Sequence, residues 1–232
     1  MNKERLSLEL KKLGISDLSK IDRLEDFMHV TLETNKSFNL TAIKDEEKFR
    51  ELMILDSAYP LKYFNFEGKK VIDIGTGAGY PGMVLATLSN GEFTLLDSTK
   101  KKVDFYGKYA LDNGYSNVNP VCDRAEEHAR KHREEYDFAI ARAVADLNIL
   151  VELLLPLLKV NGCFIALKGS KGLEELERAK TLINKLGGEV ILVDQYKLPE
   201  SKEKRINIII KKINTTSSKY PRDYSIITKK TL

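Results

Sequence analysis

Residues 71–82 read Val-Ile-Asp-Ile-Gly-Thr-Gly-Ala-Gly-Tyr-Pro-Gly, so an apolar run with one acid opens into four glycines within eight residues. The apolar residues around Asp73 predict a buried strand, and the glycines that follow allow a tight turn that a ligand can approach closely. The residues after the loop have helical composition. The order strand, glycine loop, helix places the loop and the helix N-terminus beside a nucleotide-like ligand. The first three glycines of the loop are Gly75, Gly77 and Gly79.

Downstream of this loop, short apolar runs alternate with helical patterns. The alternation predicts a parallel sheet covered on both faces, and the short connection before the last strand predicts an antiparallel closing hairpin. The predicted strands lie at 70–74, 92–97, 117–122, 136–141, 161–168, 188–195 and 205–212. The predicted helices between them lie at 81–89, 99–113, 124–133, 145–159 and 171–186.

The residues before the glycine loop have a helical pattern instead of alternating strands and helices. Apolar residues recur there with helical spacing, at 3–13, 16–35 and 45–59. A chain of 232 residues is long enough for one large α/β domain with a small appendage. We therefore expect a helical N-terminal cap over 1–66 and an α/β domain with a basic C-terminal tail over 67–232.

Charge is unevenly distributed along the chain. The net charge is +4, and the segment from Lys197 onward holds ten Lys and Arg against three Asp and Glu. A basic segment of this kind attracts a polyanion such as nucleic acid. Lysines that keep a strand edge and a tail soluble give the same pattern, so charge alone leaves both interpretations open.

Motifs for a membrane span, a metal site or a disulfide framework are missing from the sequence. No apolar stretch approaches the ~20 residues that cross a bilayer, and the first residues are charged, so we expect a soluble cytoplasmic protein. Cys122 and Cys163 have no CxxC or Cys/His ligand spacing. His128 and His132 are four residues apart but have no third ligand, so we expect no bound metal.

Two aspartates distinguish between possible ligands. Asp97 ends the second predicted strand, where a carboxylate can accept hydrogen bonds from both hydroxyls of an adenosine ribose. Dinucleotide enzymes and methyltransferases both place an acid there. Asp73, inside the first strand, is better suited to organise the loop and to face a cationic ligand than to bind a pyrophosphate. S-adenosylmethionine carries an amino group and a sulfonium but no phosphate, so Asp73 favours this methyl donor over NAD.

Further candidate site residues follow the later strands. Ala125 and Glu126 come after the third strand, where they can border an adenine ring, although helix capping also explains Glu126. Arg142 ends the fourth strand and Lys168 ends the fifth. Because ligands bind at the carboxyl ends of strands in an open α/β sheet, we predict Arg142 and Lys168 as the catalytic residues.

Two missing motifs bear on the methyl acceptor. The fourth strand is not followed by an Asn/Asp-Pro-Pro-aromatic tetrapeptide, which exocyclic-amine methyltransferases use to hold a planar amino group. The chain also has no Pro-Cys nucleophile for methylation at C5 of a pyrimidine. A ring nitrogen with its own lone pair, such as guanine N7, needs neither device. Catalysis would then consist of aligning that nitrogen with the methyl group, without a dedicated general base.

The glycine segment and several shorter motifs together resemble the bacterial small-subunit ribosomal RNA methyltransferase G family, also called glucose-inhibited division protein B. The Pro81-Gly82 end of the loop is part of this resemblance, which runs along nearly the whole chain. The supporting motifs are Asn39-Leu40-Thr41-Ala42-Ile43, Leu55-Asp56-Ser57, Leu96-Asp97-Ser98 with Lys101-Lys102, Arg124-Ala125-Glu126, Ala141-Arg142-Ala143-Val144-Ala145, Ala166-Leu167-Lys168-Gly169 and Tyr220-Pro221-Arg222.

The resemblance implies a Rossmann-like class I methyltransferase fold with seven strands and a helical cap. It implies S-adenosylmethionine as donor and, as acceptor, N7 of the guanine usually numbered 527 in 16S rRNA, in the small ribosomal subunit or its assembly intermediate. We expect the protein to act as a monomer. The cofactor positions that it implies are Gly75, Tyr80, Asp97, Ser98, Thr99, Ala125, Glu126 and Arg142.

The chain departs from the family pattern at a few positions. Met53 stands where the family often has histidine, and Ser225, Ile227 and Thr231 replace its usual glycine and prolines. Three alternatives also stay open. They are a small-molecule O- or N-methyltransferase on the same fold, an RNA-binding ribosome assembly factor that retains the fold, and a nicotinamide enzyme.

Overall fold

The computed structural model describes residues 1–229 and contains a seven-stranded sheet of order β3-β2-β1-β4-β5-β7-β6. The first five strands pair in parallel, and β7 runs antiparallel between β5 and β6. The predicted fold class and its antiparallel ending are confirmed. The strands are β1 (Lys70–Ile74), β2 (Glu92–Asp97), β3 (Val118–Cys122), β4 (Tyr136–Arg142), β5 (Leu158–Lys168), β6 (Gly188–Lys197) and β7 (Lys204–Lys212).

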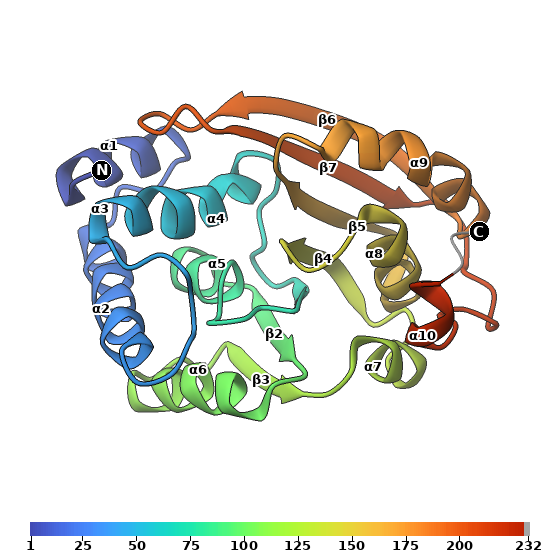
Figure 1. Cartoon of the computed structure of the whole chain (residues 1–232), viewed down its shortest axis with the longest axis horizontal. Coiled ribbons are helices and arrows are strands. Elements are labelled where there is room, and N and C mark those ends of the chain that lie inside the picture. Colours follow the sequence, from blue (N-terminus) through green and yellow to red (C-terminus); the bar gives the residue numbers. More distant parts are fainter. Residues whose placement is uncertain (230–232) are drawn as a thin grey trace.

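Helices cover both faces of this sheet (Figure 1). On one side lie α1 (Lys3–Lys12), α2 (Leu18–Asn35), α3 (Glu46–Phe49), η1 (Arg50–Leu55), α4 (Asp56–Ala58), η2 (Tyr59–Lys62), α5 (Gly82–Leu88) and α6 (Lys100–Asp112). On the other lie α7 (Ala125–Lys131), α8 (Leu147–Leu154), η3 (Leu155–Leu157), α9 (Gly172–Lys185) and the short α10 (Tyr224–Ile227). None of the helices within residues 1–229 combines the length and the apolar character needed to span a bilayer.

The N-terminal helices share a hydrophobic core with the sheet. Leu24 and Phe27 of α2 belong to the same buried cluster as Phe93 and Leu95 of β2. A buried ion pair ties this section together, because the Arg50 guanidinium donates from Nε and Nη2 to the Glu25 carboxylate. The predicted boundary between 1–66 and 67–232 therefore crosses a continuous core, and its role as a domain boundary stays a prediction.

Two predicted helices differ from those in the structure. The helix expected over 145–159 ends at Leu154, and the chain is already in β5 at Leu158. A run of apolar residues does not separate a buried helix from a buried strand, which explains the error. The helix expected over 45–59 contains a π-helical turn, η1, between α3 and α4. A π-helix is rare and often occurs at functional sites.

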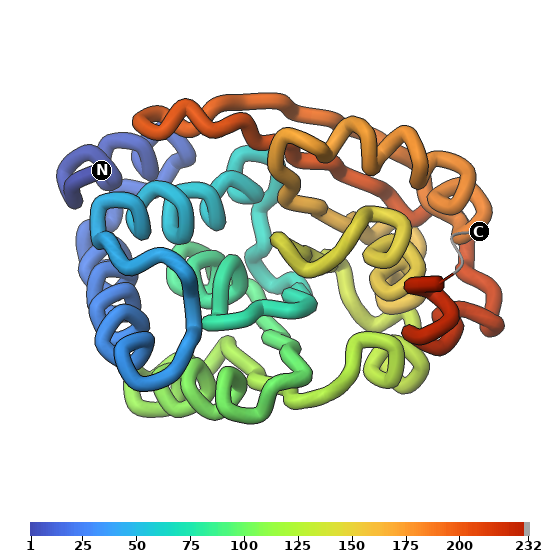
Figure 2. The backbone as a smooth tube through the Cα atoms, viewed as in Figure 1, coloured from blue at the N-terminus to red at the C-terminus, as the bar shows by residue number. Residues whose placement is uncertain are grey.

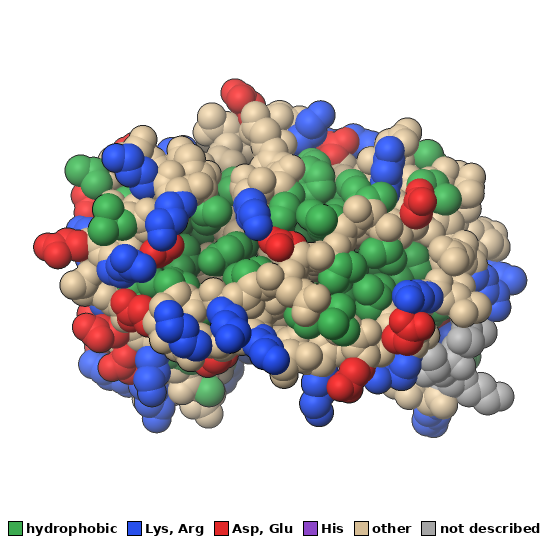
Figure 3. Space-filling view, turned by 90° about the horizontal axis from the view of Figure 1, so that it is seen from above, with side chains coloured by type: hydrophobic (Ala, Val, Ile, Leu, Met, Phe, Trp, Pro, Cys, Tyr) green, Lys and Arg blue, Asp and Glu red, His purple; other side chains and the backbone are tan. Residues whose placement is uncertain are grey.

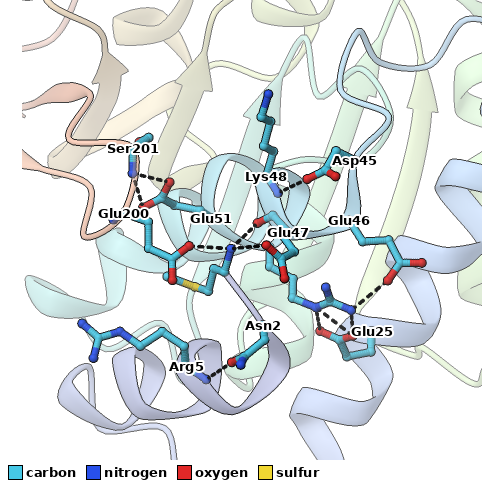
Figure 4. A network of polar contacts seen from close by, with 12 residues as sticks. Asn2, Arg5, Glu25, Asp45, Glu46, Glu47, Lys48, Glu51, Glu200 and Ser201 are labelled. Carbon is cyan, nitrogen blue, oxygen red and sulfur yellow. Dashed lines mark hydrogen bonds and ion pairs between the residues drawn. The ribbon is translucent and has the colours of Figure 1, made fainter.

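The turn of the β6–β7 hairpin extends beyond the end of β5, and it lies beside the first helices in the backbone trace (Figure 2). The ring of Tyr196 on β6 stacks on Tyr59 with 4.0 Å between centroids. Figure 4 shows the polar part of this contact, in which the Glu51 carboxylate accepts from the backbone N–H groups of Glu200 and Ser201. The hairpin is thereby fixed to the N-terminal helices at its turn.

Both edges of the sheet are poorly suited to pairing with another strand. The edge strand β3 contains Pro120, which lacks a backbone N–H. The opposite edge strand, β6, has a register shift between Val190 and Leu192, and such a bulge interrupts the row of hydrogen-bonding groups. Ile191 and Leu192 are exposed there. Seen from above the hairpin, hydrophobic side chains gather between scattered charged ones (Figure 3).

Candidate active site

A cavity of about 1090 Å³ opens at the carboxyl ends of β1, β2, β4 and β5. This is the edge of an open α/β sheet at which ligands bind. Most predicted site residues line it: Gly75, Gly77, Tyr80, Asp97, Ser98, Thr99, Ala125, Glu126, Arg142 and Lys168. The N-terminal section and the C-terminal part of the chain contribute Leu40, Ile43, Leu52, Met53, Asp56, Glu203, Arg205 and Tyr224.

Asp73 lies behind the glycine loop and is not part of the cavity wall. Its Oδ2 accepts from the Thr76 hydroxyl at 2.6 Å and from the Gly82 backbone N–H at 2.8 Å, which joins both ends of the loop to β1. Burial raises the pKa of this carboxyl to about 6, against the lowering effect of these two hydrogen bonds. The contacts agree with the predicted loop-organising role, whereas contact with a cationic ligand stays a prediction.

The glycines of the loop have two different functions in the packing. Gly75 has φ +68°, and a Cβ there would lie 2.7 Å from a methyl carbon of Val144. The β4–α8 loop can therefore rest directly on the glycine loop at the cavity wall. Gly79, with φ +95°, faces Met83 and Phe27 in the core and does not line the cavity.

Tyr80 is almost wholly buried. Its ring stacks on Phe27 at 5.1 Å and meets Phe49 edge-on at 5.3 Å, and its hydroxyl lies 3.3 Å from Thr31 Oγ1. Tyr80 therefore connects the glycine loop to the N-terminal helices. Tyr80 also lines the cavity, and its role in cofactor binding stays a prediction.

The end of β2 offers the carboxylate that a ribose requires. Asp97 Oδ2 accepts from the Gly77 backbone N–H at 3.0 Å, and Oδ1 accepts from the Thr99 backbone N–H at 2.8 Å. Each oxygen keeps a further lone pair for a ligand hydroxyl. Ser98 and Thr99 are exposed beside it. The residues at this end of the cavity thus fit the adenosine part of S-adenosylmethionine.

The next wall segment comes from the start of α7 and from α10. Glu126 is buried and accepts a hydrogen bond from Arg124 Nε at 3.1 Å. The Arg124 guanidinium also lies over the ring of Tyr224, 5.3 Å from its centroid. Ala125 contributes a small side chain beside them. Tyr224 thereby extends the wall predicted to border the adenine.

The two predicted catalytic residues have different surroundings. Arg142 donates from Nη1 to the Leu52 carbonyl at 3.0 Å and from Nη2 to Met53 Sδ at 3.4 Å. Lys168 is buried and donates to the Ala145 carbonyl at 2.6 Å, with Glu175 at 2.7 Å. Lys168 thus braces the β4–α8 loop. Direct catalysis by either residue stays a prediction.

Sequence reasoning missed Asp56, Glu203, Arg205 and Tyr224 as cavity residues. The signals were weak: Asp56 lies in the Leu55-Asp56-Ser57 motif, and Arg205 lies in the basic C-terminal segment. Ser225 and Ile227, two of the departures from the family pattern, lie in α10 beside Tyr224, and Thr231 lies outside the described residues.

His128 and His132 stack on each other at 4.2 Å, and His128 hydrogen bonds to the Tyr136 hydroxyl at 3.0 Å. Neither histidine lines the cavity. Within residues 1–229, no group of three or more His, Cys, Asp or Glu side chains is arranged to hold a metal ion.

The strand order, the glycine loop after β1 and the acid at the end of β2 define a methyltransferase that uses S-adenosylmethionine. A solved structure of an S-adenosylmethionine-dependent methyltransferase from Aquifex aeolicus has a similar fold, with a TM-score of 0.56 and 17% identity over 78% of this chain and 98% of that one. The chain belongs to the family described as rRNA small subunit methyltransferase G, GidB, whose model matches residues 20–216.

Two curated relatives carry the name ribosomal RNA small subunit methyltransferase G. The protein from Caldicellulosiruptor bescii is 45% identical over 213 residues, which are 89% of this chain and 90% of the relative. The protein from Fusobacterium nucleatum subsp. nucleatum is 38% identical over 225 residues, which are 96% of this chain and 97% of the relative. The family predicted from the sequence motifs is therefore confirmed.

Proposed function

We propose that this protein transfers the methyl group of S-adenosylmethionine to N7 of a guanine in the RNA of the small ribosomal subunit. The glycine loop, Asp97 and the start of α7 would hold the donor. Arg142 and Arg205, on the wall formed with the N-terminal section, would contact the RNA. Membership of the methyltransferase G family and the composition of the cavity wall support this assignment.

The observation that carries the N7 assignment is that the described residues of the wall include no histidine and no carboxylate without a partner. No histidine lines the cavity, and each carboxylate on its wall has a cationic or N–H partner within the described residues. The pairs are Asp56 with Arg205, Asp97 with Gly77 and Thr99, Asp123 with Lys131, Glu126 with Arg124, Asp146 with Arg178, Glu175 with Lys168 and Glu203 with Arg205.

A neutral guanine suits such a site because N7 already has an available lone pair and loses no proton on methylation. S-adenosylmethionine supplies an activated methyl group on its sulfonium. The residues of this chain have to hold the guanine in line with that methyl group and exclude water. Orientation of this kind can lower the activation free energy of a bimolecular reaction by roughly 7–11 kcal/mol.

We further propose that the protein works in the cytoplasm as a monomer, on the small subunit or an assembly intermediate. The interrupted edges of β3 and β6 support a monomer because they do not offer a strand for pairing. The guanidinium groups on the cavity wall support a substrate with phosphates.

The decisive experiment is mass spectrometry of 16S rRNA from a strain that lacks this protein. N7-methylguanine should disappear and return when the wild-type protein is supplied. Persistence of the modification would contradict the proposed function. A methylation assay that compares naked 16S rRNA with whole small subunits would then identify the substrate form.

Two further measurements separate the alternatives. Affinity for RNA should fall steeply with salt if several phosphates are contacted, whereas a small-molecule methyltransferase would show little salt dependence. Calorimetry should detect binding of S-adenosylmethionine. Absence of cofactor binding, with and without RNA, would favour an assembly factor, and binding of NAD would favour a nicotinamide enzyme.

A further inference from the structure

The carboxylate of Asp56 joins two arginines at the cavity wall. Asp56 is buried, and its Oδ2 lies 3.1 Å from Arg205 Nε and 3.6 Å from Arg142 Nη1. Its Oδ1 accepts a hydrogen bond from the Tyr196 hydroxyl at 3.2 Å. A buried carboxylate has lost its water, so these partners are what stabilise its charge.

The three charged groups come from distant parts of the chain. Asp56 begins α4 directly after the π-helical turn η1, Arg142 ends β4, and Arg205 lies at the start of β7. The same π-helical turn presents the Leu52 carbonyl, which accepts from Arg142 Nη1. The N-terminal section therefore holds both arginines at one wall of the cavity.

We propose that Asp56 is a positioning residue that aims the Arg142 and Arg205 guanidinium groups at the RNA substrate. The proposal rests on the function proposed above. Two guanidinium groups at one wall repel each other, and a carboxylate between them offsets that repulsion while fixing their rotamers. The planar donor fork of each arginine then keeps part of its hydrogen-bonding capacity for a phosphate or a base edge.

The two ion pairs of Arg205 show which of its N–H donors a substrate can use. Its Nε faces the buried Asp56, whereas its Nη1 pairs with Glu203 at 2.9 Å. The Glu203 side chain is 50% exposed, in contrast to 5% for Asp56. An RNA phosphate can replace the exposed Glu203 carboxylate on Arg205 while the buried bond to Asp56 continues to hold the side chain in place.

This arrangement differs from the purely structural ion pair between Arg50 and Glu25. Arg50 directs its donors to Glu25 and Glu46, and none of these three residues lines the cavity. Asp56, Arg142 and Arg205 all line it. The charges around Asp56 are thus accessible to a ligand, which is what a positioning role requires.

The test is Asp56→Asn, measured with the RNA substrate of the wild-type protein and with calorimetry for S-adenosylmethionine. Without the carboxylate the two arginines are no longer held in position, so we expect kcat to fall roughly 10²-fold. The dissociation constant for the cofactor should change less than about twofold. Asp56→Glu keeps the carboxylate on a side chain that is one methylene longer, so this variant should lose less of its kcat than Asp56→Asn.

Asp194→Asn is the matched control. Asp194 joins the same hairpin to the N-terminal section by accepting from the Lys62 ammonium and the Tyr63 hydroxyl, but it does not line the cavity. The Asp194→Asn variant should have a lower melting temperature than the wild-type protein and an unchanged kcat. An equal loss of kcat in Asp194→Asn and Asp56→Asn would overturn the proposal, because loosening the hairpin would then explain both results.

A double-mutant cycle with Arg205→Ala shows whether Asp56 acts through this arginine. We expect Asp56→Asn combined with Arg205→Ala to lower kcat much less than the product of the two single effects. Independent, multiplying effects would contradict the proposal, as would wild-type kcat in Asp56→Asn. Failure of the wild-type protein to methylate any rRNA would instead contradict the proposed function, so the two failures are distinguishable.

Discussion

The backbone N–H of Gly82 donates a hydrogen bond to the carboxylate of Asp73, with 2.8 Å between the nitrogen and Oδ2. Together with the Thr76 hydroxyl, this contact closes the glycine loop onto the strand before it. The loop that faces the cavity is therefore shaped from behind, by a residue that does not line the cavity itself.

Removing this acceptor should open the loop. Asp73→Ala leaves the buried Gly82 N–H without a partner, which should destabilise the fold by about 1–3 kcal/mol. It should also weaken binding of S-adenosylmethionine by about tenfold or more. Urea unfolding and calorimetry measure the two effects. Asp73→Asn keeps an acceptor oxygen and is the control; cofactor affinity unchanged in Asp73→Ala would refute the loop-organising role.

Arg142→Ala should abolish methyl transfer and leave the fold intact. The tip of the side chain is held by hydrogen bonds to Leu52 and Met53 and lies 3.6 Å from Asp56. Its loss frees one carbonyl at the cavity wall, while Asp56 keeps Arg205 as a partner at 3.1 Å and the strands of the sheet keep their contacts. We expect turnover to fall at least about 10²-fold, with a normal circular dichroism spectrum. Arg5→Ala, on the surface of α1 and paired with Glu9, should be active. Unchanged turnover in Arg142→Ala would remove Arg142 from the site.

Tyr80 should matter more for its ring than for its hydroxyl. Tyr80→Phe removes only the 3.3 Å contact with Thr31 and should cost less than about 1.5 kcal/mol in stability. Tyr80→Ala leaves a cavity between Phe27 and Phe49 and should cost about 3–5 kcal/mol. Chemical unfolding compares the two variants. Equal destabilisation by both would show that the hydroxyl, and not the packing of the ring, is the important part.

His128 should contribute to unfolding in acid. Burial lowers the pKa of its imidazole from the ordinary value of 6.5 to about 4, with the neighbouring His132 adding to the effect. A depressed pKa means that the stabilisation is present above pH 6.5 and is lost as the pH falls towards 4, because the unfolded chain takes up the proton first. His128→Gln should reduce this loss by at most about 3 kcal/mol.

Thermal melts between pH 7 and pH 4 measure this difference directly. His29→Gln is the matched control, since His29 is exposed on α2 and belongs to neither the His128–His132 stack nor the cavity wall. A wild-type acid dependence that His128→Gln leaves unchanged would assign the loss of stability to other groups.

The part of the site that would bind the methyl donor could be predicted, because its residues lie at the ends of strands that the alternating sequence pattern identifies. Asp97 and Arg142 follow short apolar runs, and the carboxyl ends of parallel strands meet at one edge of the sheet. The sheet order brings these ends together without any knowledge of side-chain packing. The same argument located the glycine loop next to Asp97.

The opposite wall could not be predicted, since it depends on contacts between distant segments. Asp56 and Arg205 are 149 residues apart in sequence and meet only when the hairpin folds over the N-terminal helices. The π-helical turn that precedes Asp56 has no reliable sequence signal. Tyr80 illustrates another limit: an aromatic residue after a glycine loop can turn into the core or towards a ligand, and the position of Phe27 decides between the two.

The anchoring of the β6–β7 turn by Glu51 also has a consequence for the order in which the protein is made. Glu51 is buried, and its carboxylate is satisfied by the backbone N–H groups of Glu200 and Ser201. On the ribosome, the N-terminal helices therefore emerge long before the groups that complete them. The glycine loop and its neighbouring strands are synthesised in between, so the nascent chain contains these segments of the donor site before the acceptor wall can close. Completion of the active site is one of the last events in the biogenesis of an enzyme whose substrate belongs to the ribosome.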